Sequence, residues 1–426
     1  MERNPGWPRR VERAFWRNFS LDLTAAAGVG VTLALVGSIL PSVARKEGLD
    51  PIGLAALGAA PFLANLLSGF SGRVGPRSHR QTGAIRAAGA ALLLVLLITS
   101  APVVLILAAL GFWISLSISA PFQLRLWGAM YPSRLRGRVV GAVGTSRAAA
   151  AAVAALVAGI LADQLGGTTV VALGALIGVV TATAYHALHV PPTAPPPRFS
   201  PRDAVRILGE RPVLRRIVLA QAFYGGGLIA AAPLYALVYI DRLGMSLTEV
   251  GIVGILGASA TTLSYYAWGA AADRFGPIVL LRAGSALGTL ALVAITLAPT
   301  ALILWPAAVA AGIASAAIDL GINATIMDET PLHERAGALA GWNTVTGARG
   351  IAAPFVAAGL VQFGIVDMTT AMLLCAAVAV VGVVMFSRVG GARSGRLTTD
   401  TAVVALPPLP AGAVTPARVT RSVEPA

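Results

Sequence analysis

The decapeptide "WGAAADRFGP", residues 268–277, places two opposite charges inside an otherwise apolar and glycine-rich part of the chain. Asp273 and Arg274 lie between Gly269 and the pair Gly276–Pro277, and long uncharged runs flank the stretch on both sides. Glycine adopts positive φ without steric cost and lets two backbones approach closely. The decapeptide therefore predicts a tight charged turn between two apolar helices.

The composition indicates that most of this chain is solvated by lipid. Of its 426 residues, 56% are hydrophobic and only 12% are charged, whereas soluble domains carry about 25% charged residues. A bilayer core is crossed by about 20 apolar residues in a helix. Runs of this kind recur twelve times, near 18–40, 52–72, 84–100, 103–130, 138–162, 168–188, 214–240, 248–270, 278–298, 301–327, 338–363 and 367–387.

The arginines predict the orientation of these spans. They gather before the first span and in the second, fourth and sixth connections, whereas the odd connections are short and hold few basic residues, each balanced by acids. Basic connections stay on the cytoplasmic side of a membrane. We therefore expect a multi-pass protein of the cytoplasmic (inner) membrane with both termini in the cytoplasm. Topology also accounts for the net charge of +14, so no nucleic-acid partner is expected.

The sixth connection divides the chain into two parts. It is proline-rich and then basic, and it separates six spans from six more. Beyond the last span the tail is rich in Gly, Pro, Ala and Thr, a composition typical of disorder. The predicted units are a cytoplasmic N-terminal segment, an N-terminal bundle, a linker, a C-terminal bundle and a disordered tail, at 1–17, 18–188, 189–213, 214–388 and 389–426.

A second glycine-bounded turn lies 200 residues upstream of Gly269. It reads "GFSGRVGP", 69–76, and contains Gly69, Arg73 and Gly75. The fourth and tenth connections also correspond, because "PSRLRGR", 132–138, lies 199 residues before "PLHERAG", 331–337. Turns at matched places in two sets of six helices indicate an internal duplication.

With these features the chain resembles the major facilitator superfamily, whose signature after the second helix reads approximately G-x-x-x-D-R-x-G-R-[RK] and recurs more weakly after the eighth. "GAAADRFG" matches the weaker copy, whereas "GFSGRVGPR" departs from the signature at the Asp position. The resemblance spans residues 15–390. It implies an all-α integral membrane fold of twelve helices in two pseudo-symmetric six-helix bundles, and secondary transport by alternating access.

The resemblance implies a gate at the charged turns. Asp273 is expected to face the start of the fifth helix, near residues 137–140 and Arg136 and Arg138, because a carboxylate is favoured at a helix N-terminus. Arg73 is expected to face the start of the eleventh helix, which carries Asp328, Glu329 and Glu334. The alternative is that both stretches are ordinary solvated loops.

Ionisable residues within the spans are candidates for the substrate and coupling site, since charge at bilayer depth is costly. Asp319 and Arg349 lie at equal depth on consecutive spans, which predicts a pair or a shared network. The resemblance places helices 1, 4, 7 and 10 around a central cavity and would expose polar residues on them. The alternative role is interhelical packing. The candidates are Asp319, Arg349, Asp22, Arg125, Arg147, Gln123, Asn323, Tyr224 and Gln221.

We expect a secondary active transporter of a small molecule, coupled to a proton at Asp319 or Asp22 and working as a monomer in lipid. The direction of transport, including efflux, stays open. The alternatives are a transport-inactive sensor or scaffold, a facilitator without ion coupling, and a membrane-embedded enzyme, although no catalytic triad or HExxH motif occurs. No cofactor is expected, and no metal site, since Cys375 is the only cysteine and His186 and His189 lack a third ligand.

Overall fold

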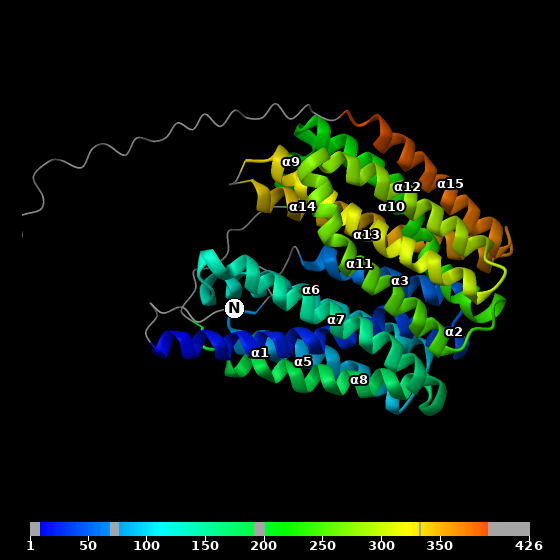
Figure 1. Ribbon diagram of the computed structural model, residues 1–426. Helices are drawn as coiled ribbons and strands as arrows, with labels where there is room; N and C mark the ends of the chain where they lie inside the picture. Colours follow the sequence, from blue (N-terminus) through cyan, green and yellow to red (C-terminus); the bar gives the residue numbers. More distant parts are fainter. Residues whose placement is uncertain (1–8, 69–75, 191–200, 332–333, 391–426) are drawn as a thin grey trace, which may run out of the picture. The chain divides into compact units, whose positions relative to one another are not determined.

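The computed structural model describes residues 9–68, 76–190, 201–331 and 334–390, and no β-strand occurs within these ranges. The predicted disordered tail lies almost wholly outside them, as does the first charged turn with Gly69, Arg73 and Gly75. The described chain up to Val389 forms one compact unit of helices, coloured from blue to red along the sequence in Figure 1.

The first half of this unit begins with one long span that changes its helical form twice. The span consists of α1 (Arg9–Ala34), a π-helical segment η1 (Leu35–Ile39) and α2 (Leu40–Lys46). Five further spans follow it in the order predicted from the sequence. They are α3 (Pro51–Ser68), α5 (His79–Leu92) with η2 (Leu93–Leu97), α6 (Pro102–Met130), α7 (Ser133–Leu165), and α8 (Gly167–Ala182) with η3 (Thr183–Ala187).

The second half repeats this arrangement after a short surface helix, α9 (Pro201–Glu210). Its first span also contains a π-helical segment, η4 (Leu237–Arg242), about 200 residues after η1. Its six spans are α10 (Pro212–Ala236) with η4, α11 (Leu247–Phe275), α12 (Pro277–Leu297), α13 (Ala301–Glu329), α14 (Arg335–Gln362) and α15 (Met368–Arg388).

Twelve spans are present, as the sequence predicts. Eleven described helices are long and apolar enough to cross a membrane, and the twelfth, Pro51–Leu67, is a shorter apolar helix. Proline starts several of them, at Pro51, Pro102, Pro212 and Pro277. Proline suits the first turn because its missing N–H has no partner there in any case.

Packing within the two halves follows one pattern. In the first half α1 packs on α7 and α8, while α6 packs on α3 and α5. In the second half the equivalent helices do the same: α10 packs on α14 and α15, and α13 packs on α11 and α12. Between the halves, α7 packs on α11 and α14 on α3, which are equivalent pairs under the same exchange. The contacts therefore describe two pseudo-symmetric six-helix bundles.

The charged decapeptide differs in one respect from the turn predicted for it. Helix α11 continues through Phe275, so Asp273 and Arg274 lie in its last turn and Gly269 lies within the helix. Only Gly276 forms the turn, at φ 82°, and Pro277 begins α12 directly after it. Positive φ is the conformation that glycine tolerates and other residues resist, so a single residue suffices to reverse the chain.

Candidate functional site

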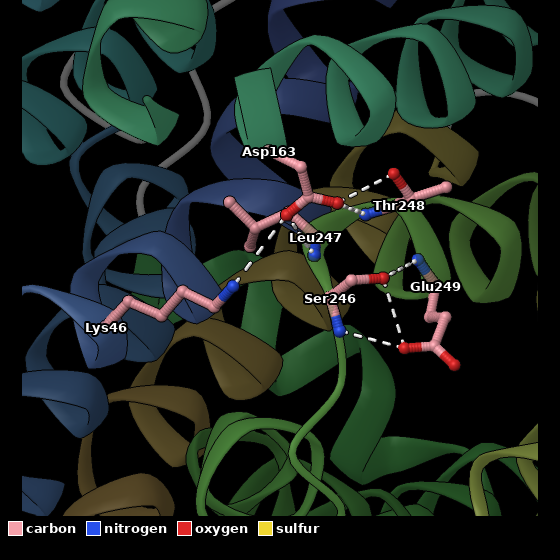
Figure 2. A network of polar contacts seen from close by, with 6 residues as sticks. All are labelled: Lys46, Asp163, Ser246, Leu247, Thr248 and Glu249. Carbon is pink, nitrogen blue, oxygen red and sulfur yellow. Dashed lines mark hydrogen bonds and ion pairs between the residues drawn. The ribbon is translucent and has the colours of Figure 1, made fainter. Parts of the chain in front are cut away.

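The two halves are bonded to each other at the end of the bundle where α7 ends and α11 begins, here called the far end. The Asp163 carboxylate, on α7, accepts hydrogen bonds from the backbone N–H groups of Leu247 at 2.9 Å and Thr248 at 2.8 Å. It also accepts one from the Thr248 hydroxyl at 2.7 Å. Figure 2 shows these contacts with Lys46, whose ammonium lies 3.8 Å from the same carboxylate.

Asp163 completes the cap of a helix in the other half. Within α11's own sequence, Ser246 and Glu249 form a reciprocal capping box (Figure 2). This box leaves the N–H groups of the first two helical residues unpaired, and unpaired donors at a helix start need an acceptor. The Asp163 carboxylate supplies it from the first half, and its charge also suits the positive end of the helix dipole.

A second contact between the halves lies at the same end. The Arg45 guanidinium, on α2, donates to both oxygens of Asp241 on η4, with N–O distances of 2.7 to 3.0 Å. A further donor of Arg45 binds the Leu49 carbonyl at 2.9 Å, which fixes the side chain in place. The Arg45–Asp241 pair joins the ends of the equivalent first and seventh spans.

Glycines along α7 and α11 show where these two helices meet. A methyl group added to Gly159 would lie 2.4 Å from the Leu247 carbonyl oxygen, and one on Gly251 would lie 2.6 Å from that of Ala155. At the other end of the same two helices, four glycines have open space where a side chain would stand: Gly137, Gly141, Gly144 and Gly269. We call this second end the arginine end. The two helices are in contact at the far end, whereas nothing lies within 4 Å of the side-chain position at these four glycines of the arginine end.

The predicted gate residues at the arginine end do not meet in this structure. Asp273 is exposed and makes no hydrogen bond or ion pair with any other described residue, and Arg138 is exposed as well. Arg136 instead donates to the carbonyls of Gly128 at 2.9 Å and Tyr131 at 3.2 Å. Glu334 pairs with Arg211.

A polar stripe runs along one exposed face of α13. Ser315, Asp319 and Asn323 follow one another at intervals of four residues and are all exposed, so they share one helix face. The Asp319 carboxylate accepts a hydrogen bond from the Tyr265 hydroxyl of α11 at 3.2 Å. Asn323 donates to the Asp319 carbonyl at 2.8 Å. Arg147, an exposed residue of α7 in the first half, interacts electrostatically with Tyr265.

The predicted pair of Asp319 and Arg349 is absent. Arg349 donates to the backbone carbonyl of Gln221 on α10, whereas Asp319 binds Tyr265, and no hydrogen bond or ion pair between described atoms joins the two. Equal depth does not fix how each helix is rotated, and these side chains turn to different neighbours. Tyr224 is 3% exposed and packs edge-on against Phe386 in the second-half core, so its role here is packing.

The sequence matches the Major Facilitator Superfamily over residues 23–300 and 217–413. The chain belongs to this superfamily. No curated protein sequence matches it.

The fold of this superfamily member is also that of several solved transporters. A structure of the nucleoside transporter NupG aligns with 87% of this chain and 100% of its own, at 16% identity and a TM-score of 0.72. A bacterial homologue of the human lysosomal transporter Spinster, in an inward-facing and occupied conformation, aligns with 90% of this chain and 97% of its own, at 15% identity and a TM-score of 0.68. The human organic anion transporter MFSD10 aligns with 89% of this chain and 100% of its own, at 12% identity and a TM-score of 0.60. At these identities the likeness shows the fold.

In this superfamily member Asp22 is buried, contrary to the exposure expected for it. It is 2% exposed, and its carboxylate accepts hydrogen bonds from the Trp127 indole at 2.6 Å and the Tyr131 hydroxyl at 3.3 Å. Trp127 lies in the last turn of α6, and Tyr131 follows directly after that helix. Arg125, also on α6, lies over the Phe122 ring at 5.2 Å.

The sequence reasoning missed Arg86, the central polar residue of the first half. Arg86, on α5, is 7% exposed and donates to the Ser119 hydroxyl at 2.8 Å, to the Tyr185 hydroxyl and to the Gln123 amide oxygen. Gln123, one of the predicted residues, is therefore a partner of this arginine. A lone arginine within an apolar run, "GAIRAAGA" at 83–90, was the available signal.

Proposed function

We propose that this protein is a secondary active transporter that moves a small molecule across the cytoplasmic membrane by alternating access. One observation carries the proposal: the two halves are bonded at the far end of α7 and α11, whereas glycines at the arginine end of the same two helices have open space beside them. A site that can be sealed at one end while open at the other is what alternating access requires.

The arginine distribution assigns the sides of the membrane in this proposal. Arginines flank the start of α1 and the α6–α7 connection, both at the arginine end. Basic segments remain in the cytoplasm, so the open end is cytoplasmic and this conformation is inward-facing. Asp163, Arg45 and Asp241 then form the external seal. Asp273 makes its contact with the start of α7 only in the outward-facing state.

Asp319 is the better of the two candidates for the proton-binding group. It is exposed on the polar stripe, and so can exchange a proton with the side of the membrane to which the site is open. Tyr265 is bonded to it from α11, the helix that also meets the other half, so a change of charge at Asp319 acts at the moving contact. Asp22 is enclosed by Trp127 and Tyr131.

Uptake into vesicles tests the proposal. Purified protein is reconstituted in liposomes, and entry of a radiolabelled panel of nucleosides and organic anions, the classes carried by NupG and MFSD10 by name, is followed with and without an imposed pH gradient. We expect saturable uptake of at least one compound that rises with the gradient. Asp319→Asn should abolish the gradient-driven part, whereas Asp203→Asn on the surface helix α9 should not.

Each failure has its own meaning. Uptake that ignores the gradient in the wild type indicates a facilitator. Gradient-driven uptake that persists in Asp319→Asn removes this residue from coupling. No uptake, together with no change of conformation under any compound, favours the sensor or scaffold.

A further inference from the structure

Arg349 lies in the middle of α14 and has no acidic partner among the described residues. Its guanidinium donates to the Gln221 backbone carbonyl, and its Nε finds no acceptor among the described residues. The side chain is only partly buried. A guanidinium offers five N–H donors in a planar fork and remains charged at any physiological pH. Arg349 therefore keeps most of its binding capacity unused.

The neighbouring helix makes room for this guanidinium. A methyl group on Gly225 of α10 would lie 2.9 Å from an Arg349 terminal nitrogen and 3.2 Å from its central carbon. The glycine belongs to the run Gly225–Gly226–Gly227 within α10. A glycine within a helix lowers the stability of that helix relative to alanine, so space for the Arg349 guanidinium is kept at the expense of helix stability.

A second arginine, on the equivalent helix of the first half, also lacks a bonded carboxylate among the described residues. Arg147, which stands 202 residues before Arg349 on the equivalent helix α7, is also exposed and has no carboxylate bonded to it within the described chain. Asp319 of the α13 stripe is already bonded to Tyr265. Each half thus carries, within a span, one arginine that no described carboxylate neutralises.

We propose that the transported molecule is a small organic anion and that Arg349 binds its carboxylate or phosphate group. This inference rests on the proposed transport function and adds its substrate class. Planar, paired N–H donors fit the two oxygens of a carboxylate or phosphate, and such charge-assisted bonds are the strong ones. Arg147, on the other half, adds to the positive potential that attracts the anion.

Benzoate and benzamide have nearly the same shape, but only benzoate is charged, so comparing them separates the effect of charge from the effect of size. The thermal unfolding midpoint of the purified full-length protein is measured against benzoate and benzamide, and against phosphate and sulfate, at constant ionic strength. We expect the unfolding midpoint to rise saturably with benzoate or with one of the inorganic anions, and not to rise with benzamide. Arg349→Gln should raise the half-saturating concentration about 10- to 100-fold, the range for lost hydrogen bonds to a charged group.

Two further variants make the result decisive. Arg282→Gln is the matched control, because Arg282 is a part-buried arginine of the same half that also donates to backbone carbonyls, those of Phe386 and Val389. It should leave the half-saturating concentration unchanged. Arg349→Lys keeps the charge without the fork, should fold if the glutamine variant does not, and should weaken binding several-fold.

Equal shifts with benzoate and benzamide, no saturable shift with any of the three anions, or unchanged binding in the Arg349 variants would overturn the proposal. None of these outcomes depends on the vesicle assay. A protein that takes up neutral nucleosides and ignores these anions would remain a transporter and would refute only the anionic substrate.

Discussion

Removing the Asp163 carboxylate should release the far end of the bundle. Asp163→Ala deletes three hydrogen bonds, from Leu247 and Thr248, and the ion pair with Lys46. Loss of an N-cap costs about 0.5–2 kcal/mol. The dipole contribution of a carboxylate at a helix start is about 0.3–1 kcal/mol when exposed and up to about 2 when partly buried.

These contacts join opposite halves, so the loss falls on the inward-facing state alone. The Asp163 side chain is 29% exposed, so its dipole contribution lies between the values for an exposed and for a partly buried carboxylate. A net loss of about 2 kcal/mol changes the ratio of inward- to outward-facing molecules about 30-fold. A population that is about 97% inward-facing would become nearly even.

Cysteine labelling reads this shift. Cys375 is buried and is the only cysteine of the chain, so Cys375→Ala gives a background without a reactive thiol. Cysteine replacing Gly141 or Gly269 stands in open space at the arginine end and should react with a membrane-impermeant maleimide from that side. Adding Asp163→Ala should slow the labelling of both positions.

Asp367 provides the matched control for this substitution. Its carboxylate also caps a helix, α15, by accepting from the N–H groups of Thr369 at 3.0 Å and Thr370 at 3.2 Å, but all three residues belong to one half. The hydrogen bond from the Thr370 hydroxyl holds the pKa of Asp367 below its ordinary value, so this cap is ionised at neutral pH as well. Asp367→Ala should leave the labelling unchanged. Equal labelling rates in Asp163→Ala and the wild type would refute the reasoning.

Two other substitutions test the remaining polar residues. Arg86→Met leaves Ser119, Tyr185 and Gln123 without their donor, at about 1–3 kcal/mol for each buried group left unpaired. This substitution should lower Tm by about 5 °C or more. A fall in Tm no larger than that of the exposed control Arg80→Met would contradict the central place of Arg86. Asp273→Asn should leave Tm nearly unchanged, since Asp273 has no partner among the described residues, yet it should speed labelling at Gly141→Cys because a contact of the outward-facing state is lost. Identical labelling with and without this substitution would make the decapeptide an ordinary helix end.

The spans and their duplication could be predicted because lipid imposes a simple rule on sequence. A helix that crosses a bilayer must be apolar over a fixed length, and basic connections must stay on one side. Both properties can be read from the chain without knowing which helices touch. The same rule singled out Asp319 and Arg349 as unusual, because charge within a span is rare.

Side-chain partners could not be predicted, since they depend on how each helix is rotated. Successive residues of a helix turn by about 100°, so equal depth does not bring Asp319 to Arg349. Asp163 ends a span and looked like an ordinary connection residue. Its role appears only when the start of α11, with two unpaired N–H groups, is placed beside it. Asp22 was expected to be exposed, but Trp127 and Tyr131 cover it.

The central claim is that the two ends of the bundle open in turn, and distances between spin labels test it most directly. One labelled pair, Gly141→Cys with Gly269→Cys, spans the halves at the arginine end, and another, Gln164→Cys with Thr300→Cys, spans them at the far end. All four positions lie in the described chain, and Cys375→Ala provides the background. The account predicts two distances for each pair, with the long distance at the arginine end accompanied by the short one at the far end. Asp163→Ala should favour the short distance of the pair at the arginine end and, in the same molecules, the long distance of the pair at the far end. A single distance for each pair that no substitution or ligand changes, or two ends that lengthen together, would contradict the account.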